Sequence, residues 1–356
     1  MRALARAAQI PASLTLVAKR VERRLGEVLA VERERWTAFD PDVTPFIDAL
    51  AQLAQAGAKR IRPAFCHWAY VGAGGDPDDP LIVDAGVAFE LLQAFALVHD
   101  DVMDGSATRR GAPAVHLEFA SRHTMAGWRG EPRRFGEAVA ILVGDLAHVY
   151  ADQMVAAAPP AAQDIWHELR IELNVGQYLD VLGTARGDLE RARAHLIARF
   201  KSGKYTIERP LHVGAAMAGR LDELQAPLSA FGDPLGEAFQ LRDDLLGAFG
   251  DERRTGKPVG DDLREGKPTP LLAIAAERMS PKQGEVLARV GDRGLSAADV
   301  AAVQEVLVAT GALAEVETTI ERLTSRALGA LDRVAITDEA KAALAELGEF
   351  VAWRGA

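Results

Sequence analysis

Apolar residues recur at helical intervals along most of the chain. In the first such segment, Val17, Val21, Leu25, Val28 and Leu29 are separated mainly by charged residues, which is the pattern of an amphipathic helix. The same spacing covers residues 43–56, 59–71, 80–104, 134–156, 163–182, 188–202, 204–219, 234–249, 297–309 and 337–353. No sustained alternation of β-branched residues is present, and no Asn-Gly or Asp-Gly pair joins two such runs. The sequence therefore predicts an all-α protein.

Short segments rich in glycine and proline separate these helices, at residues 72–80, 127–132, 159–160 and 256–270. None of them is long enough to act as a linker between domains. A length of 356 residues would by itself favour about two domains, but the continuous helical pattern predicts one domain over residues 1–356. Residues 1–20 are basic and contain no acid. We expect a frayed N-terminal extension there, with a transit peptide as the alternative.

Composition and charge exclude several classes of function. The chain is 49% hydrophobic, which provides for a large core and excludes global disorder. The formal net charge of -10 leaves no dominant basic face and argues against nucleic-acid binding. The single cysteine, Cys66, excludes an intrachain disulfide and a zinc site of several cysteines, and it favours the cytoplasm. No uninterrupted apolar run is long enough to span a bilayer, so we expect no transmembrane segment.

The strongest chemical signal is the acidic segment Asp100-Asp101-Val102-Met103-Asp104, which ends an apolar helical run. Asp100 and Asp104 lie one turn apart on the same helix face, where like charges repel. They also lie near a helix C-terminus, where the helix dipole disfavours anions. A cation relieves both costs, and ligand sets made only of oxygen suit Mg²⁺ or Mn²⁺. A solvated acidic turn is the alternative, because this pattern alone is weakly specific.

A second acidic pair, Asp243-Asp244, follows Phe239-Gln240 on another apolar helical stretch. Two acidic helices that face each other would hold a metal cluster and a diphosphate between them. For this pair taken alone, an exposed helix face is the alternative.

Cationic residues accompany both acidic segments. Each of them, taken singly, is more often a solvated surface charge. Together they describe a site in which carboxylates hold metal ions while metal ions and cations hold phosphates, which indicates a diphosphate substrate. The cationic residues are Lys59 and Arg62 at a predicted helix start, Arg109-Arg110-Gly111 in a loop, Lys201-Ser202-Gly203-Lys204 at another helix start, and Lys257 and Lys267 beside a glycine-rich segment.

These segments occur in the order and approximate spacing of the trans-isoprenyl diphosphate synthases, and the chain resembles short-chain members of the farnesyl or geranylgeranyl type. The resemblance rests on Gly57–Pro63, Asp100–Asp104 with Arg109–Gly111, Gly176-Gln177, Lys201-Ser202 and Phe239–Asp244. It implies a single bundle of long antiparallel helices around a central cavity, usually as a homodimer. It also implies that Mg²⁺, or Mn²⁺, assists the condensation of isopentenyl diphosphate with an allylic diphosphate.

The resemblance further implies a role for each matched residue. Isopentenyl diphosphate would be bound by Lys59, Arg62, Gln93 and Arg110. The allylic diphosphate would be bound by Arg109, Lys201, Ser202, Gln240, Lys257 and Lys267. The metal ions would be held by Asp100, Asp104 and Asp243, and the catalytic set would add Asp101, Asp244 and Lys201.

Two positions depart from the family pattern. Gly247 stands where many relatives carry a third aspartate in the second acidic motif. Metal binding there must rest on Asp243, with Asp244 acting through water, and we assign no role to Asp251. Ser202 replaces the more common threonine and keeps the hydroxyl group.

Two other functions share parts of this pattern. A class I terpene cyclase ionises the same kind of diphosphate but has no isopentenyl diphosphate to bind, whereas Lys59, Arg62 and Arg110 are all present here. A non-catalytic partner subunit usually lacks one acidic motif, whereas this chain keeps both.

Product length is expected to depend on Phe95 and Ala96, which the resemblance places at the floor of the tail cavity. Ala96 lies one turn, about 5.4 Å, before Asp100 on nearly the same face. Phe95 lies about 140° around the helix and should point to the side. A small Ala96 beside a large Phe95 resembles the geranylgeranyl type. We therefore expect mainly a C20 product, with the C15 farnesyl product as the alternative.

Overall fold

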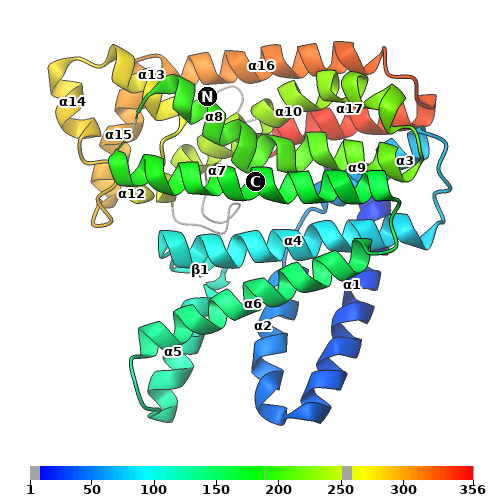
Figure 1. Ribbon diagram of the computed structural model, residues 1–356. Coiled ribbons are helices and arrows are strands. Elements are labelled where there is room, and N and C mark those ends of the chain that lie inside the picture. Colours follow the sequence, from blue (N-terminus) through cyan, green and yellow to red (C-terminus); the bar gives the residue numbers. More distant parts are fainter. Residues whose placement is uncertain (1–8, 188, 251–258, 356) are drawn as a thin grey trace. The chain divides into compact units, whose positions relative to one another are not determined.

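The computed structural model describes residues 9–187, 189–250 and 259–355. These residues form helices almost throughout, with one two-stranded ladder among them (Figure 1), which confirms the predicted all-α class. They divide into two compact units. Among the described residues, the N-terminal unit comprises Ala12–His67 and Asp76–Pro159, and the C-terminal unit comprises residues 9–11, Trp68–Gly75 and the part of the chain from Pro160 onward. The single domain predicted over residues 1–356 stays a prediction.

The N-terminal unit is built around α4, which packs against α1, α2 and α6. Phe89, Leu91 and Leu92 of α4 are completely buried. A helix that is covered on most sides is apolar almost all round, which explains the composition of α4. The elements of this unit are α1 (Ala12–Phe39), the 3₁₀ helix η2 (Pro41–Val43), α2 (Thr44–Gln55), the first part of α3 (Ile61–Gly72), α4 (Pro80–Asp104), β1 (Thr108–Arg109), β2 (Ala112–Pro113), α5 (Val115–Ala126) and α6 (Pro132–Val155).

Local chemistry sets both ends of α4. The Asp79 carboxylate accepts a hydrogen bond from the backbone N–H of Leu81 at 2.9 Å, and Pro80 occupies the first turn. At the other end, Gly105 adopts a left-handed conformation with φ of 60° and closes the helix. The last residue of α4 is therefore Asp104, and the first acidic segment forms the last turn of the helix, as predicted.

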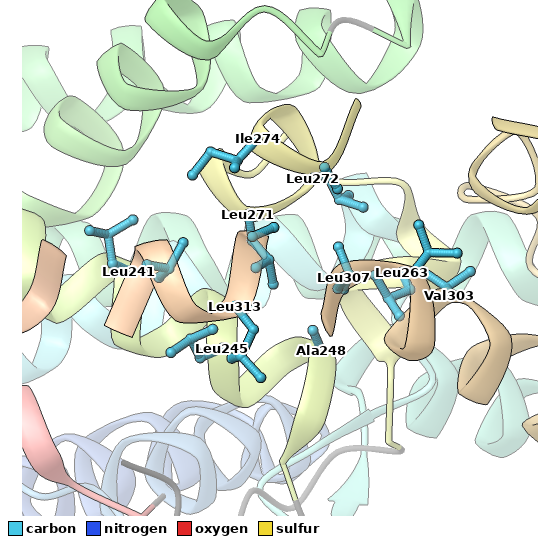
Figure 2. Close-up of a cluster of buried hydrophobic side chains, with 14 of the residues drawn as sticks. Leu241, Leu245, Ala248, Leu263, Leu271, Leu272, Ile274, Val303, Leu307 and Leu313 are labelled. Atoms are coloured by element: carbon cyan, nitrogen blue, oxygen red, sulfur yellow. The ribbon is translucent and has the colours of Figure 1, made fainter. Parts of the chain in front are cut away.

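The C-terminal unit is organised around the long helix α10, which packs against η3, α9, α16 and α17. Figure 2 shows part of its core, in which Leu241, Leu245 and Ala248 of α10 belong to one cluster with leucines of later helices. Besides the end of α3, the elements are α7 (Pro160–Arg186), α8 (Arg191–Ile197), the π-helix η3 (Ala198–Glu208), α9 (Arg209–Met217), α10 (Leu221–Phe249), α12 (Asp261–Glu265), α13 (Pro270–Arg278), α14 (Pro281–Leu287), α15 (Ala297–Ala309), α16 (Ala312–Leu331) and α17 (Asp338–Trp353).

The helices differ from the sequence prediction at several places. Helices α5, α13, α14 and α16 lie in segments for which no helix was predicted. The break expected near residue 203 is absent, because α8, η3 and α9 run on without interruption. The helix expected from residue 234 begins at Leu221 and includes Pro227 and Pro234. The frayed extension expected over residues 1–20 is helical from Ala12 onward, since Leu14 and Val17 are buried in α1. Residues 1–8 lie outside the described residues.

Two helices, α4 and α6, are long and apolar enough to cross a membrane by length and composition, and α15 with α16 would form a third candidate if this bent pair were one span. This differs from the expectation of no transmembrane segment. The expectation required an uninterrupted apolar run, whereas mean hydropathy over 18 residues tolerates a few polar positions. In α4, 61% of the most apolar window is buried inside the protein, and this burial accounts for its composition.

Candidate active site

The predicted site residues form two groups, one in each unit. The N-terminal unit holds Lys59, Arg62, Gln93, Phe95, Ala96, Asp100, Asp101, Asp104, Arg109 and Arg110. The C-terminal unit holds Lys201, Ser202, Gln240, Asp243, Asp244 and Lys267. Lys257 and Asp251 lie outside the described residues.

A minimal hairpin directs Arg109 and Arg110. Strands β1 and β2 pair Thr108 with Pro113 and Arg109 with Ala112. The connecting residues, Arg110 and Gly111, have φ of 53° and 78°. A two-residue hairpin turn of this kind needs positive φ at both positions, which is uncommon for arginine. The sequence pattern did not predict this hairpin, because each strand has only two residues.

The hairpin places the Arg109 side chain in contact with the first acidic segment. Asp101 is 1% exposed, and its Oδ1 accepts a hydrogen bond from Arg109 Nε at 2.8 Å. Arg109 Nη2 also lies 3.6 Å from Oδ2 of Asp100. Asp101, which we predicted to be catalytic, is therefore placed to orient the arginine that we predicted for the allylic diphosphate.

Arg60 is the buried cation of the segment that precedes α3. Its Nη1 pairs with Oε2 of Glu90 at 2.5 Å, and its backbone has a left-handed φ of 57°. Because α3 begins at Ile61, Lys59 lies before the helix, which was predicted to begin at residue 59. Lys59 and Arg62 flank Arg60 in the sequence, and both are half-buried.

Four arginines make the N-terminal unit strongly cationic at this place. Burial lowers the pKa of Arg110, the carboxylate of Glu90 raises it, and the charges of Arg60, Arg109 and Arg62 lower it further. Nη1 of Arg110 donates to the backbone carbonyl of Leu53 at 2.5 Å. Cations that repel one another at short range favour a bound anion, as a diphosphate site requires.

One face of α4 leads toward the acidic segment. Gln93, Ala96 and Asp100 share this face at intervals of three and four residues, and each is half-buried. Phe95 lies to the side, as its helical position predicts. Its ring stacks on His148 of α6 with centroids 4.8 Å apart and meets His99 edge-on at 4.7 Å.

In the C-terminal unit, Lys201 lies in η3. Such π-helical segments are rare and often occur at functional sites. Nζ of Lys201 pairs with Oδ2 of Asp180 in α7 at 2.5 Å. A Cβ atom at Gly176 would lie 2.5 Å from the backbone N of Lys201, so glycine is needed for this close approach. The sequence analysis missed Asp180, although it follows Gln177 by three residues and Gly176 by four, one turn further along the helix.

The second acidic segment lies on α10. Nε2 of Gln240 donates to Oδ1 of Asp244 at 2.8 Å. Asp244 is 5% exposed, and its buried Oδ2 accepts no hydrogen bond from the described residues. Burial raises the pKa of Asp244 well above its usual range, and the charges of Asp262, Asp243 and Asp180 raise it further, against the hydrogen bond from Gln240. A buried carboxylate oxygen without a donor is suited to a cation.

Asp244→Asn is expected to stabilise the metal-free protein by about 1 kcal/mol or more at pH 7, because it removes a buried charge and keeps the acceptor for Gln240. The pKa of Asp244 is higher in the folded state than the usual aspartate value of 3.8, so ionisation costs stability as the pH rises through the folded-state pKa. The advantage of the variant should therefore vanish as the pH falls toward 4. Thermal unfolding of both proteins in EDTA between pH 7 and pH 4 measures this difference in stability.

A matched control is Asp233→Asn, which changes a carboxylate on the same helix that pairs with Arg199 at 2.8 Å near the surface. This variant should gain no stability at pH 7. If Asp244→Asn were no more stable than the unmodified protein at pH 7, the conclusion that burial disfavours the ionised carboxylate of Asp244 would be wrong.

Arg354 is a residue of this site that the sequence analysis missed. Its Nη2 pairs with Oδ1 of Asp243, and its guanidinium carbon lies 3.9 Å from the ring centroid of Phe239. Nε of Arg242 donates to the backbone carbonyl of Arg354 at 2.9 Å and helps to fix it. The pair joins residues 111 positions apart, so no local spacing could have indicated it.

The remaining predicted residues of this unit are Ser202 and Lys267. Ser202 follows Lys201 in η3 and is half-buried. Nζ of Lys267 lies 2.7 Å from Oε2 of Glu265. Within the described ranges, no three Asp, Glu, His or Cys side chains are grouped closely enough to hold a metal ion by themselves.

Comparison with known proteins identifies the family. The profile described as polyprenyl synthetase matches residues 44–307. The chain belongs to the polyprenyl synthetase family. It is an isoprenyl diphosphate synthase, a trans-prenyltransferase with the all-α isoprenoid synthase fold, as the sequence motifs predicted.

Similar proteins cover nearly the whole of this synthase. A geranylgeranyl pyrophosphate synthase from Corynebacterium glutamicum, solved with isoprenyl diphosphate and magnesium, is 38% identical with a TM-score of 0.90, and the match covers 95% of this chain and 98% of that one. The geranylfarnesyl diphosphate synthase of Aeropyrum pernix is 31% identical, over 86% of this chain and 93% of the relative. Component 2 of a heptaprenyl diphosphate synthase from Geobacillus stearothermophilus is 29% identical, over 92% and 96%.

Proposed function

We propose that this synthase uses Mg²⁺ to condense isopentenyl diphosphate with an allylic diphosphate and makes mainly geranylgeranyl diphosphate. The observation that carries the proposal is that each unit combines acidic and cationic side chains in the same place. In the N-terminal unit, Arg109 forms ion pairs with Asp100 and Asp101. In the C-terminal unit, Lys201 pairs with Asp180, and the charge of Asp180 raises the pKa of Asp244. Such a combination suits a substrate that is both phosphorylated and bound to metal.

The metal ions would be held by Asp100, Asp104 and Asp243, with Asp244 assisting. The donor set fits Mg²⁺, because it consists of carboxylate oxygens and includes the buried Oδ2 of Asp244. Mn²⁺ would suit the same ligands. When bound, the metal supplies positive charge that stabilises the diphosphate as a leaving group.

The cations of this chain supply the rest of the stabilisation. Lys201 and Arg109 bind the allylic diphosphate and stabilise the charge that develops as the carbon–oxygen bond breaks and the electron pair leaves with the diphosphate. Asp180 and Asp101 hold these two cations in place. Ser202, Gln240, Lys257 and Lys267 would complete the allylic site.

The second substrate then attacks the allylic cation. Lys59, Arg62, Gln93 and Arg110 would hold isopentenyl diphosphate so that C4 of its double bond forms a bond to C1 of the cation. Loss of a proton from C2 restores a neutral double bond, and the released diphosphate accepts this proton, so no protein base is needed. Water must be excluded during these steps, because it would quench the cation.

The product, the assembly and the location form the finer part of the proposal. Ala96 leaves room below Asp100, which supports a C20 product over C15.

A homodimer is supported by stripes of exposed apolar residues that a second copy would cover, on α6 (Ile141, Leu142, Val149) and on α7 (Ile171, Val175, Tyr178, Val181). Analytical ultracentrifugation tests the dimer. The buried thiol of Cys66 suits the cytoplasm that we propose as the location.

Incubation of the pure protein with Mg²⁺, isopentenyl diphosphate and an allylic diphosphate tests the proposal. Elongation to a linear C20 diphosphate supports it, and a mainly C15 product would make the protein a farnesyl diphosphate synthase. A cyclic hydrocarbon would indicate a terpene cyclase. Inactivity of the chain alone would indicate a partner subunit, a role suggested by the relative named as a synthase component.

Arg110 and Lys201 should separate the two diphosphate sites kinetically. Arg110→Ala is expected to raise KM for isopentenyl diphosphate by about tenfold or more and to change the allylic KM much less, since loss of a hydrogen bond to a charged group costs about 1.5–3 kcal/mol. Lys201→Ala, a matched cation deletion, should have the opposite preference. Steady-state kinetics with each substrate varied in turn measures both constants, and equal effects on both substrates would contradict the division.

A further inference from the structure

Four charged side chains that the proposed mechanism does not use form one network in the C-terminal unit. Nζ of Lys204 lies 2.8 Å from Oε2 of Glu208 and 3.6 Å from Oε1 of Glu172. Nε and Nη2 of Arg209 donate to the two carboxylate oxygens of Glu172 at 2.7 and 2.6 Å. Glu172 and Glu208 are 8% and 5% exposed. Two cations therefore neutralise two buried carboxylates, which would be costly to bury alone.

Ser229 and His212 extend this network to α10 and along α9. Oγ of Ser229 on α10 donates to Oε1 of Glu208 at 2.7 Å and lies 3.1 Å from Nε2 of His212 on α9. Nη1 of Arg209 lies 3.4 Å from Nδ1 of His212. Burial lowers the pKa of His212 to about 4, so its ring is neutral at pH 7 and leaves the charge balance unchanged. The network thus joins α7, η3, α9 and α10.

The network includes side chains of the π-helix that carries Lys201. Such segments usually comprise a single turn, whereas η3 is π-helical over 11 residues. Lys201 pairs with Asp180 of α7, and Lys204, three residues later, approaches Glu172 of the same helix. Ion pairs thus fasten η3 to α7 at two places, which lie eight residues apart along α7.

The end of η3 is held against α10. Glu208, the last residue of η3, accepts the hydrogen bond from Ser229, and a Cβ atom at Gly232 would lie 3.0 Å from the Cα atom of Glu208. A glycine at position 232 permits this close approach of the two helices. The contacts of Glu172 and Ser229 therefore hold η3 against both α7 and α10.

We propose that Glu172 and Arg209 are positioning residues for the allylic diphosphate, because they hold η3 in the π-helical form that presents Lys201 and Ser202. This inference rests on the proposed function of Lys201. A turn closed by i→i+5 hydrogen bonds contains one residue more than a turn closed by i→i+4 bonds. Relaxation of one such turn after Lys201 to an α-helix would turn this residue by roughly 100°, the rotation of one residue. Its Nζ would then no longer face Asp180.

Glu172→Gln tests the inference in steady-state kinetics. The variant keeps an acceptor for Arg209 but removes the charge that attracts Lys204 and Arg209. The allylic KM is expected to rise about tenfold or more, because a small displacement of a positioned group is costly. KM for isopentenyl diphosphate should remain near normal. Backbone amides of residues 198–208 should exchange hydrogen faster in the substrate-free variant, since η3 is held less firmly.

The matched control is Glu223→Gln, which changes an exposed pair of the same kind in the same unit. Nε and Nη2 of Arg220 donate to both carboxylate oxygens of Glu223 at 3.0 and 2.6 Å. Neither KM nor the hydrogen exchange of residues 198–208 should change in this variant.

Two further variants separate positioning from folding stability. Glu172→Leu/Arg209→Met replaces the buried pair by apolar side chains, an exchange that often preserves stability but cannot hold Lys204. Its Tm should exceed that of Glu172→Gln, while its allylic KM stays raised. Arg209→Lys keeps the charge and loses the two-point contact, so a smaller rise of about threefold in the allylic KM is expected. A normal allylic KM in folded Glu172→Gln or in the folded double variant would overturn the inference.

Lys201→Ala separates this inference from the function on which it rests. If Lys201→Ala raises the allylic KM and Glu172→Gln does not, positioning by Glu172 is overturned and the proposed allylic site stands. If Lys201→Ala leaves the allylic KM unchanged, the assignment of Lys201 to the allylic diphosphate fails, and the role of Glu172 fails with it.

Discussion

Asp100→Asn is expected to lower kcat by about a hundredfold or more, the usual cost of losing a principal electrostatic stabiliser. Asn keeps the shape of the side chain but removes the charge that would hold Mg²⁺ beside the departing diphosphate. Folding stability should change little, because Asp100 and Asp104 repel each other when no cation is bound. Single-turnover rates with saturating Mg²⁺ and both substrates measure the loss, and thermal unfolding checks the fold.

Asp48→Asn is a matched control in the same unit, since Asp48 pairs with Arg33 at 2.6 Å near the surface and has no role in the site. Its turnover should remain near normal. Asp243→Asn should lose turnover as Asp100→Asn does, but it also removes the partner of the buried Arg354, so some loss of stability is expected there. Near-normal turnover of Asp100→Asn would show that the metal assignment is wrong.

Much of the fold follows from local pattern. The apolar spacing located α4, and the chemistry of Asp79 and Gly105 explains its limits. The same reasoning failed at α10, which was predicted to begin at residue 234 but begins at Leu221 and contains Pro227 and Pro234. Proline removes one backbone hydrogen bond, but the burial of Leu228 and Phe231 in this helix outweighs that loss.

The π-helix η3 was also beyond local pattern. It depends on the close approach of α10, where a Cβ atom at Gly236 would lie 2.6 Å from the backbone oxygen of Gly203. A glycine at each position permits this contact, yet neither glycine signals a partner that lies 33 residues away in the printed sequence. The sequence therefore predicted α7, α9 and part of α10 but not their mutual fit, and it missed α13, α14 and α16.

The site was predictable to the extent that its residues form short motifs. The two acidic segments and the cations near them could be found because each lies within a few residues of a recognisable pattern. Asp180 and Arg354 could not, because each joins the site through a contact with a distant part of the chain. Both are charged residues whose sequence neighbourhoods would suit an ordinary solvated surface.

The product-length prediction depends on how Phe95 and Ala96 are placed on α4. The Phe95 ring is held against His148 and His99, so it does not lie beneath Asp100. Ala96 shares the face of Asp100 one turn before it, and its side chain is a single methyl group. A growing chain that enters below the metal site would therefore meet Ala96 and not the Phe95 ring.

Ala96→Phe is expected to shift the main product from C20 to C15 or shorter, because an aromatic ring at this position fills the space that the fourth isoprene unit needs. Chain-length analysis of the products at equal substrate ratios measures the shift. Ala126→Phe, the same change at the exposed end of α5, is the matched control and should leave the product distribution unaltered. An unchanged distribution in an active Ala96→Phe enzyme would show that side chains on other helices form the floor of the tail cavity.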